Sequence, residues 1–263
     1  MDIITHNFFC LLRSGALGEH EPIEPMSAFK WKRLSQMAHA QHVENVLLRG
    51  IRNYEADFAM NMPKSVIDSM QCGQGEAPTP HLSNPLLNRR LKRIFYKERH
   101  AIDTNVGALD VLSIITTNVS TMLNKGIMLG GIIELGSYLR EKGDKVDFVK
   151  LEHWLNKLHL RRMAQLQGSM LMAVLHFDQD ELPFVGRVES SAYRLVLRSV
   201  VHTANDTAEE WHFRQSKAGF VQNNSVLLRR NLRRSLCYFV YAPIETVSNY
   251  LHNFARSLQE IEE

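Results

Sequence analysis

The sequence predicts an all-α protein, a compact array of about ten helices with little or no strand. Apolar residues recur at three- and four-residue intervals along most of the 263 residues, the period of a helix that packs one face on a core. Evidence for strands is thin, since a short run such as Cys237–Tyr241 fits a strand or the continuation of a helix equally well. The hydrophobic fraction of 44% and the charged fraction of 22% are those of an ordinary folded protein.

The N-terminal part predicts two helices, at residues 3–13 and 28–52. In the second, Trp31, Leu34 and Met37 begin a helical apolar stripe, Ser27 suits the N-cap and Gly50 lies near the end. The segment between the helices, GEHEPIEP, has the glycine, proline and acidic residues of a surface loop.

A linker or exposed loop is expected at residues 71–85. This segment holds two glycines and three prolines, and each proline lacks the backbone donor that a helix needs. The chain therefore divides into an N-terminal helical segment, 1–70, and a C-terminal helical region, 86–263, which we expect to pack together as one domain.

The C-terminal region predicts eight more helices. Asp147 suits the N-cap of one of them, Pro243 suits the first turn of the last, and residues 141–144 form a compact turn between antiparallel neighbours. The expected ranges are 86–100, 108–124, 130–142, 147–158, 160–176, 190–203, 223–238 and 243–261.

Charge, cysteines and hydropathy together favour a cytoplasmic protein. The net charge, +3 from 31 basic and 28 acidic residues, is too small to indicate a nucleic-acid partner unless the charge is concentrated. Cys10, Cys72 and Cys237 are too far apart for a disulfide framework or a zinc motif. The first residues lack a secretory signal, and no run reaches the roughly 18 to 20 apolar residues of a transmembrane helix.

Several segments together resemble the uncharacterised bacterial nucleotidyltransferases found in surface-polysaccharide loci. They are residues 8–19 (FFCLLRSGALGE), the helix from Trp31 to Ile51, the run Asn84–Leu91 (NPLLNRRL), residues 126–184 and the basic, aromatic tail Leu227–Tyr241. Each consists mainly of helix-packing residues, but they occur in the order of the family and together cover most of the chain.

The resemblance implies a catalytic core that this chain does not carry. In the family the core supplies a Lys-Gly pair, an arginine and an Asp-x-Asp pair on a strand, where carboxylates two residues apart point the same way and hold divalent ions. Here residues 53–83 contain Asp57 and Asp68 with no Asp-x-Asp. We therefore expect no catalytic residue, no cofactor and no metal site.

Other candidate chemistry has a simpler structural interpretation. Asp144 and Asp147 follow Gly136-Ser137 as in polymerase-β-like enzymes, but they are three residues apart and suit a turn and a helix cap. His39 and His42, one helical turn apart, are favoured as the polar face of a half-buried helix over a metal chelate. Cys10 and Cys237 are expected to be buried, and Cys72 to be accessible.

Four arginines form a candidate patch for an anionic partner: Arg229, Arg230, Arg233 and Arg234. They alternate with leucines and precede Tyr238, Phe239 and Tyr241, which suits a surface helix docked by its leucines or, less often, a helix that binds RNA or an anionic membrane.

Three functional hypotheses follow. The first is a non-catalytic helical protein, derived from the nucleotidyltransferase family by loss of its core, that binds an intact relative or a polysaccharide-synthesis enzyme as an interaction or regulatory module. The second is a degenerate or partner-dependent nucleotidyltransferase. The third is a basic helical module that binds RNA or anionic membrane, although a nucleic-acid partner is not favoured.

Overall fold

The computed structural model describes residues 2–54, 63, 66–67, 70, 79–201 and 232–259, and every regular element in these ranges is a helix, which confirms the all-α prediction. Residues 192–201 and 232–238 are also helical. The other helices are α1 (Ile3–Leu17), α2 (Ala28–Ala40), α3 (Glu44–Asn53), α5 (Pro85–Arg99), α6 (Val106–Asn124), α7 (Leu129–Lys142), η1 (Gly143–Lys145), α8 (Phe148–Lys157), α9 (Arg161–Leu175), η2 (Gln179–Glu181) and α12 (Pro243–Gln259).

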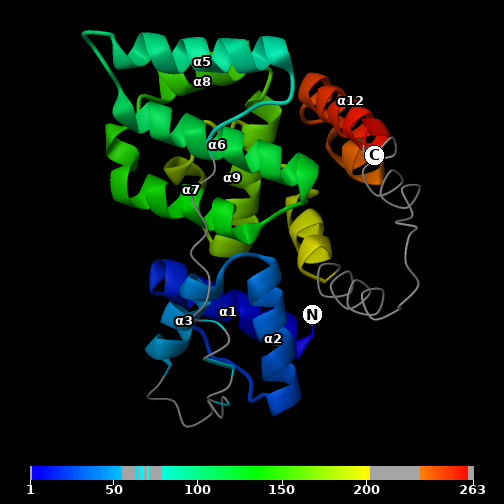
Figure 1. Cartoon of the computed structure of the whole chain (residues 1–263). Coiled ribbons are helices and arrows are strands. Elements are labelled where there is room, and N and C mark those ends of the chain that lie inside the picture. Colours follow the sequence, from blue (N-terminus) through cyan, green and yellow to red (C-terminus); the bar gives the residue numbers. More distant parts are fainter. Residues whose placement is uncertain are drawn as a thin grey trace.

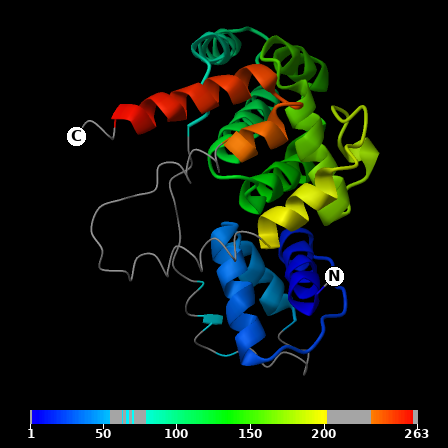
Figure 2. The ribbon, with the colours of Figure 1, turned by 90° about the vertical axis from the view of Figure 1, so that its right-hand side faces the viewer.

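The helices form two groups along the long axis of the molecule. Helices α1, α2 and α3 lie together at one end, and α5 to α9 form the larger group at the other, with α12 along its side (Figures 1 and 2). Helix α1 touches α7 and α9, so the two groups are in direct contact. The central helices α6 and α9 carry many of the fully buried side chains.

Most expected helices are present with ends shifted by a few residues. Asp147 caps α8 as predicted, its carboxylate accepting a hydrogen bond from the Lys150 N–H at 2.9 Å. Pro243 begins α12. Cys237 and Tyr238 end a helix that is followed by a turn, so the extended alternative for 237–241 is wrong. Residues 71–78, 202–203, 223–231 and 260–261 of the predicted linker and helices lie outside the described residues.

The single helix expected at 28–52 is in fact two helices. His42 adopts the left-handed conformation with φ of 54°, and the Val43 N–H donates to the Ala38 carbonyl at 3.1 Å, which closes the end of α2. His39 and His42 therefore do not share a helical face. His39 instead pairs with Glu44, Nδ1 to Oε1, at 2.8 Å.

Helix α6 is a core helix despite its membrane-like composition. Among the described helices it alone is long and apolar enough to cross a bilayer, but 61% of that stretch is buried inside the protein. Its apolar side chains pack against α7, α8 and α9, which accounts for its hydropathy. The described part of the chain therefore has no clear transmembrane span.

Glycines in α7 allow close packing against α6 and α9. A Cβ on Gly131 would overlap the side-chain oxygen of Asn118, and one on Gly136 would lie 2.8 Å from Leu171. The Asn118 amide donates to the Gly131 carbonyl at 2.9 Å and to the buried Gln167 side chain at 3.0 Å. These contacts join α6, α7 and α9.

Helices α1 and α3 cross at a pair of glycines. A Cβ on Gly15 would overlap the Val46 carbonyl oxygen, and one on Gly50 would overlap the Leu11 carbonyl oxygen. The two backbones touch at this crossing, so any larger residue must push the helices apart. The glycine that the sequence suggested only as a helix end is a packing residue.

We predict that Gly15→Ala and Gly50→Ala each lower the free energy of unfolding by about 2 to 3 kcal/mol, since the added methyl group has no space. Urea unfolding measures the change. Gly143→Ala is the matched control, because nothing lies within 4 Å of its Cβ position, and we expect a change within about 0.5 kcal/mol. Equal effects at all three sites would contradict the proposed close crossing.

Candidate functional site

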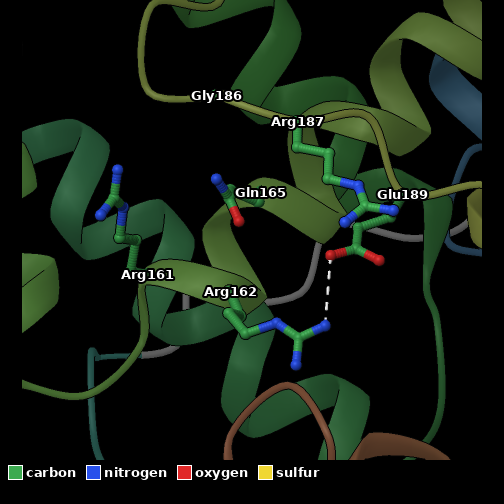
Figure 3. A pocket seen from close by; sticks show the side chains of 6 residues that line it. All are labelled: Arg161, Arg162, Gln165, Gly186, Arg187 and Glu189. Carbon is green, nitrogen blue, oxygen red and sulfur yellow. Dashed lines mark hydrogen bonds and ion pairs between the residues drawn. The ribbon is translucent and has the colours of Figure 1, made fainter.

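A cavity of about 630 Å³, widely open to solvent, lies beside the start of α9 and is lined by Arg161, Arg162, Gln165, Gly186, Arg187 and Glu189 (Figure 3). The first three residues lie in the first two turns of α9. The other three lie in the segment that follows η2. None of these residues was a candidate in the sequence analysis.

Packing of the chain on α9 brings the two walls together. Leu160, the residue before α9, is fully buried and fixes the start of the helix, while Arg161 and Arg162 turn outward. On the other side, Phe184 and Val185 are buried against Gly168, where a Cβ would collide with Val185. Gly186 and Arg187 follow directly and so pass over α9.

The arginines of the cavity differ in how they are held. Arg162 donates to the Val240 carbonyl at 3.0 Å, pairs with Glu189 at 3.4 Å and lies over the Tyr241 ring at 5.4 Å. Arg161 pairs with Glu152 at 2.7 Å. Arg187 has no ion pair with any residue of the described ranges. The cavity therefore presents three guanidinium groups, of which two are balanced by carboxylates.

Helix α12 buries polar residues and exposes apolar ones, the opposite of an ordinary surface helix. Its inner face carries Glu245, Thr246 and Asn249, all at most 3% exposed. The Glu245 carboxylate accepts hydrogen bonds from the Ser83 and Asn84 N–H groups, and Asn249 accepts one from the Ser83 hydroxyl at 2.8 Å. These polar contacts attach α12 to the residues before α5, and burial raises the Glu245 pKa.

The opposite side of α12 is apolar and exposed. We call it the α12 outer face, and it consists of Ile244, Val247, Leu251 and Phe254, which are 38 to 57% exposed. Phe239 and Val240, in the turn before the helix, are exposed as well. An exposed apolar row on a helix whose buried face is polar is typical of an interaction surface.

Only two of the four arginines of the predicted patch, Arg233 and Arg234, fall within the described residues. Arg229 and Arg230 lie outside the described residues. Arg233 is exposed, and Arg234 donates a hydrogen bond to the Asn124 carbonyl oxygen. Asp57, Asp68 and Cys72 also lie outside the described residues.

One cluster of titratable groups lies where the two groups of helices meet, between the loop after α1 and the end of α9. Glu19, Glu21 and His176 offer ligand atoms within 4.8 Å of one another, the spacing of a metal site. The sequence analysis missed this group because 155 residues separate Glu21 from His176. Both Glu21 oxygens, however, accept from Arg13, at 2.7 and 2.6 Å, so a guanidinium already balances that carboxylate.

Cys10 and Arg13 lie at the base of this cluster. Burial raises the Cys10 pKa to about 11, so the thiol stays protonated at neutral pH and is a poor nucleophile. Arg13, 7% exposed, also donates to the Val174 carbonyl at 3.2 Å. Cys10 is thus buried as predicted, whereas Cys237 is only half-buried. The arrangement is an ion-pair network that holds α1 against the end of α9.

No protein-family model, curated protein or solved structure matches this chain.

We predict that Arg13→Met lowers the free energy of unfolding by about 1 to 3 kcal/mol at pH 7, because the Val174 carbonyl and Glu21 lose a charged donor. Hydrogen bonds from Arg13 hold the Glu21 pKa below its ordinary value of 4.5. The difference in free energy of unfolding between the wild type and Arg13→Met should thus be largest above pH 4.5. It should decrease as the pH falls through the lowered pKa of Glu21. Urea unfolding across this range tests the prediction. The exposed Arg49→Met is the control, and a difference independent of pH would contradict the role of Glu21.

Proposed function

We propose that the chain is a non-catalytic helical interaction module that binds a partner protein through the α12 outer face. The observation that supports this most is the reversed amphipathicity of α12, with polar residues buried and apolar residues exposed. Exposing Ile244, Val247 and Leu251 in a row is unfavourable for a free protein unless a partner covers them.

Spacing and charge define the partner surface. Ile244, Val247, Leu251 and Phe254 recur at intervals of three, four and three residues, the seam along which two helices pack side by side. None of the four is charged, so binding should depend on apolar burial and little on salt. The partner should therefore present an apolar helical stripe.

The resemblance of the sequence to nucleotidyltransferases of polysaccharide loci suggests who the partner is. We propose an intact relative or another polysaccharide-synthesis enzyme in the cytoplasm, with this chain as a pseudoenzyme that regulates or positions it. Loss of the strand-borne aspartates removes the chemistry while the helical surfaces used for association can be retained.

A degenerate or partner-dependent nucleotidyltransferase is the second candidate, and one observation bears on it. Glu19 and Glu21 lie close together, as a shared metal would require. Arg13 neutralises Glu21, and both carboxylates follow α1 in a loop instead of lying on a strand. A module that binds RNA or anionic membrane has less support, because Arg234 is engaged with Asn124.

We predict that Leu251→Glu weakens binding to a purified intact nucleotidyltransferase from the same locus at least about tenfold, since a charge would be buried in an apolar seam. Calorimetry measures the dissociation constant and should give a negative heat-capacity change for the wild type. Leu251 is 57% exposed, so the variant should fold normally.

Val149→Glu on α8 is the matched control, because Val149 is 82% exposed and lies outside the α12 outer face. It should bind like the wild type. Unchanged binding by Leu251→Glu would overturn the proposal. Self-association in ultracentrifugation that Leu251→Glu abolishes would show instead that a second copy covers this face.

We also predict no magnesium-dependent nucleotide binding. Titration of the chain with ATP, CTP or dTTP in the presence of magnesium should give no heat that depends on the metal, because the described residues hold no strand-borne carboxylate pair. A micromolar dissociation constant that is lost when magnesium is removed would favour the enzyme. Glu19→Gln would then show whether the Glu19, Glu21 and His176 group is responsible.

A further inference from the structure

We infer that the cavity beside the start of α9 is a binding site for a small phosphate-bearing molecule, a phosphomonoester of about the size of a sugar phosphate. The inference rests on the arginines, the helix end and the volume of this cavity. It is independent of the α12 outer face and of any partner protein.

The guanidinium groups are arranged in advance of binding. Arg162 is fixed by Val240, Glu189 and the Tyr241 ring, and Glu152 holds Arg161. A guanidinium has five N–H donors, and the contacts of Arg161 and Arg162 with Glu152, Val240 and Glu189 use only some of them, so donors remain for a ligand. Arginine is suited to phosphate because its planar donors match two phosphate oxygens at once.

The charge balance favours an anion. Glu152 and Glu189 offset two of the three arginines, and the third, Arg187, has no ion pair with the described residues. One positive charge is thus left at the cavity. A phosphomonoester would place its anionic group near Arg187 while its neutral part occupies the space beside Gln165 and Gly186 (Figure 3).

The backbone adds to this preference. Helix α9 has 15 residues, and Leu160 at its N-cap position offers no side-chain acceptor to the first N–H groups. The first turn of a helix carries a partial positive charge that attracts phosphate. Arg161 and Arg162 are the first two residues of this helix and both line the cavity, so the first turn lies at its edge.

The cavity volume selects the ligand class. About 630 Å³ falls within the usual range of small-molecule sites and exceeds what a bare phosphate ion fills. Polar and apolar atoms line the cavity in similar measure, and the three arginines supply its positively charged groups, which suits a molecule that joins an anionic group to a larger uncharged part. Arginines supply the donors to the phosphate oxygens at this proposed site, which separates it from the metal-bridged site of a magnesium-dependent nucleotidyltransferase.

The test is calorimetry with glucose 6-phosphate, inorganic phosphate and glucose, at low salt and without magnesium. We expect glucose 6-phosphate to bind, inorganic phosphate to bind more weakly and glucose not to bind. Arg187→Gln should raise the dissociation constant of glucose 6-phosphate about tenfold to a hundredfold, because it removes a charge-assisted contact. Arg187 is exposed and makes no ion pair among the described residues, so folding should be unaffected.

Two further variants make the test specific. Gly186→Val leaves every charge in place but adds bulk beside Gln165, since the Gly186 Cβ position lies 3.5 Å from the Gln165 amide nitrogen. It should weaken the binding of glucose 6-phosphate more than the binding of inorganic phosphate. Arg33→Gln, an exposed arginine on α2, is the matched control and should bind like the wild type.

The outcomes distinguish a small phosphomonoester from inorganic phosphate and from a phosphate-bearing macromolecule. Absence of binding by both phosphate compounds, or equal weakening by Arg187→Gln and Arg33→Gln, would overturn the inference. Inorganic phosphate binding as tightly as glucose 6-phosphate would keep the anion site but overturn the phosphomonoester class. Tight binding of RNA or of vesicles containing phosphatidylserine that Arg187→Gln abolishes would assign the surface to a macromolecule and overturn the small-ligand inference.

Discussion

The arrangement of the molecule depends on Gln41, a fully buried residue between α2 and α3. The first N–H groups of α7 have no cap from their own segment, since Met128 offers no side-chain hydrogen bond. Gln41 supplies both acceptors: its side-chain oxygen takes the Leu129 N–H and its carbonyl takes the Gly130 N–H, each at 3.1 Å. Gln41 and Leu129 are both buried, so the Leu129 N–H has no water to turn to, and the two bonds tie the turn between α2 and α3 to the start of α7.

Helix α9 joins the fixed body to the candidate site. Near its C-terminal end, the Val174 carbonyl accepts from Arg13 of α1. At its middle, Gln167 donates to the Ile115 carbonyl of α6 at 3.2 Å. A helix held at its middle and one end by buried polar contacts presents its first turn in a constant position. Arg161 and Arg162 therefore rest on an element held by buried contacts, while Arg187 lies in the segment after η2 that packs on α9.

The α12 outer face and the cavity have opposite chemistry and suit different partners. The outer face is apolar and linear, and burial of apolar area would dominate its binding. The cavity is concave and cationic, and charge-assisted hydrogen bonds would dominate there. Val240, in the turn before α12, accepts a hydrogen bond from Arg162 of the cavity. A ligand in the cavity would thus border the turn from which α12 begins.

Local sequence determined the helices, because the apolar period of a helix and caps such as Asp147 and Pro243 act within a few residues. It did not determine the break at His42, since a left-handed residue other than glycine is stabilised there by contacts of α7 with the turn. Nor did it determine the cavity or the Arg13 network. Arg162 and Arg187 are brought together only because Phe184 and Val185 pack on α9, and Glu21 meets His176 only because α1 lies against the end of that helix. Such proximity comes from packing between distant segments, for which local spacing carries no signal.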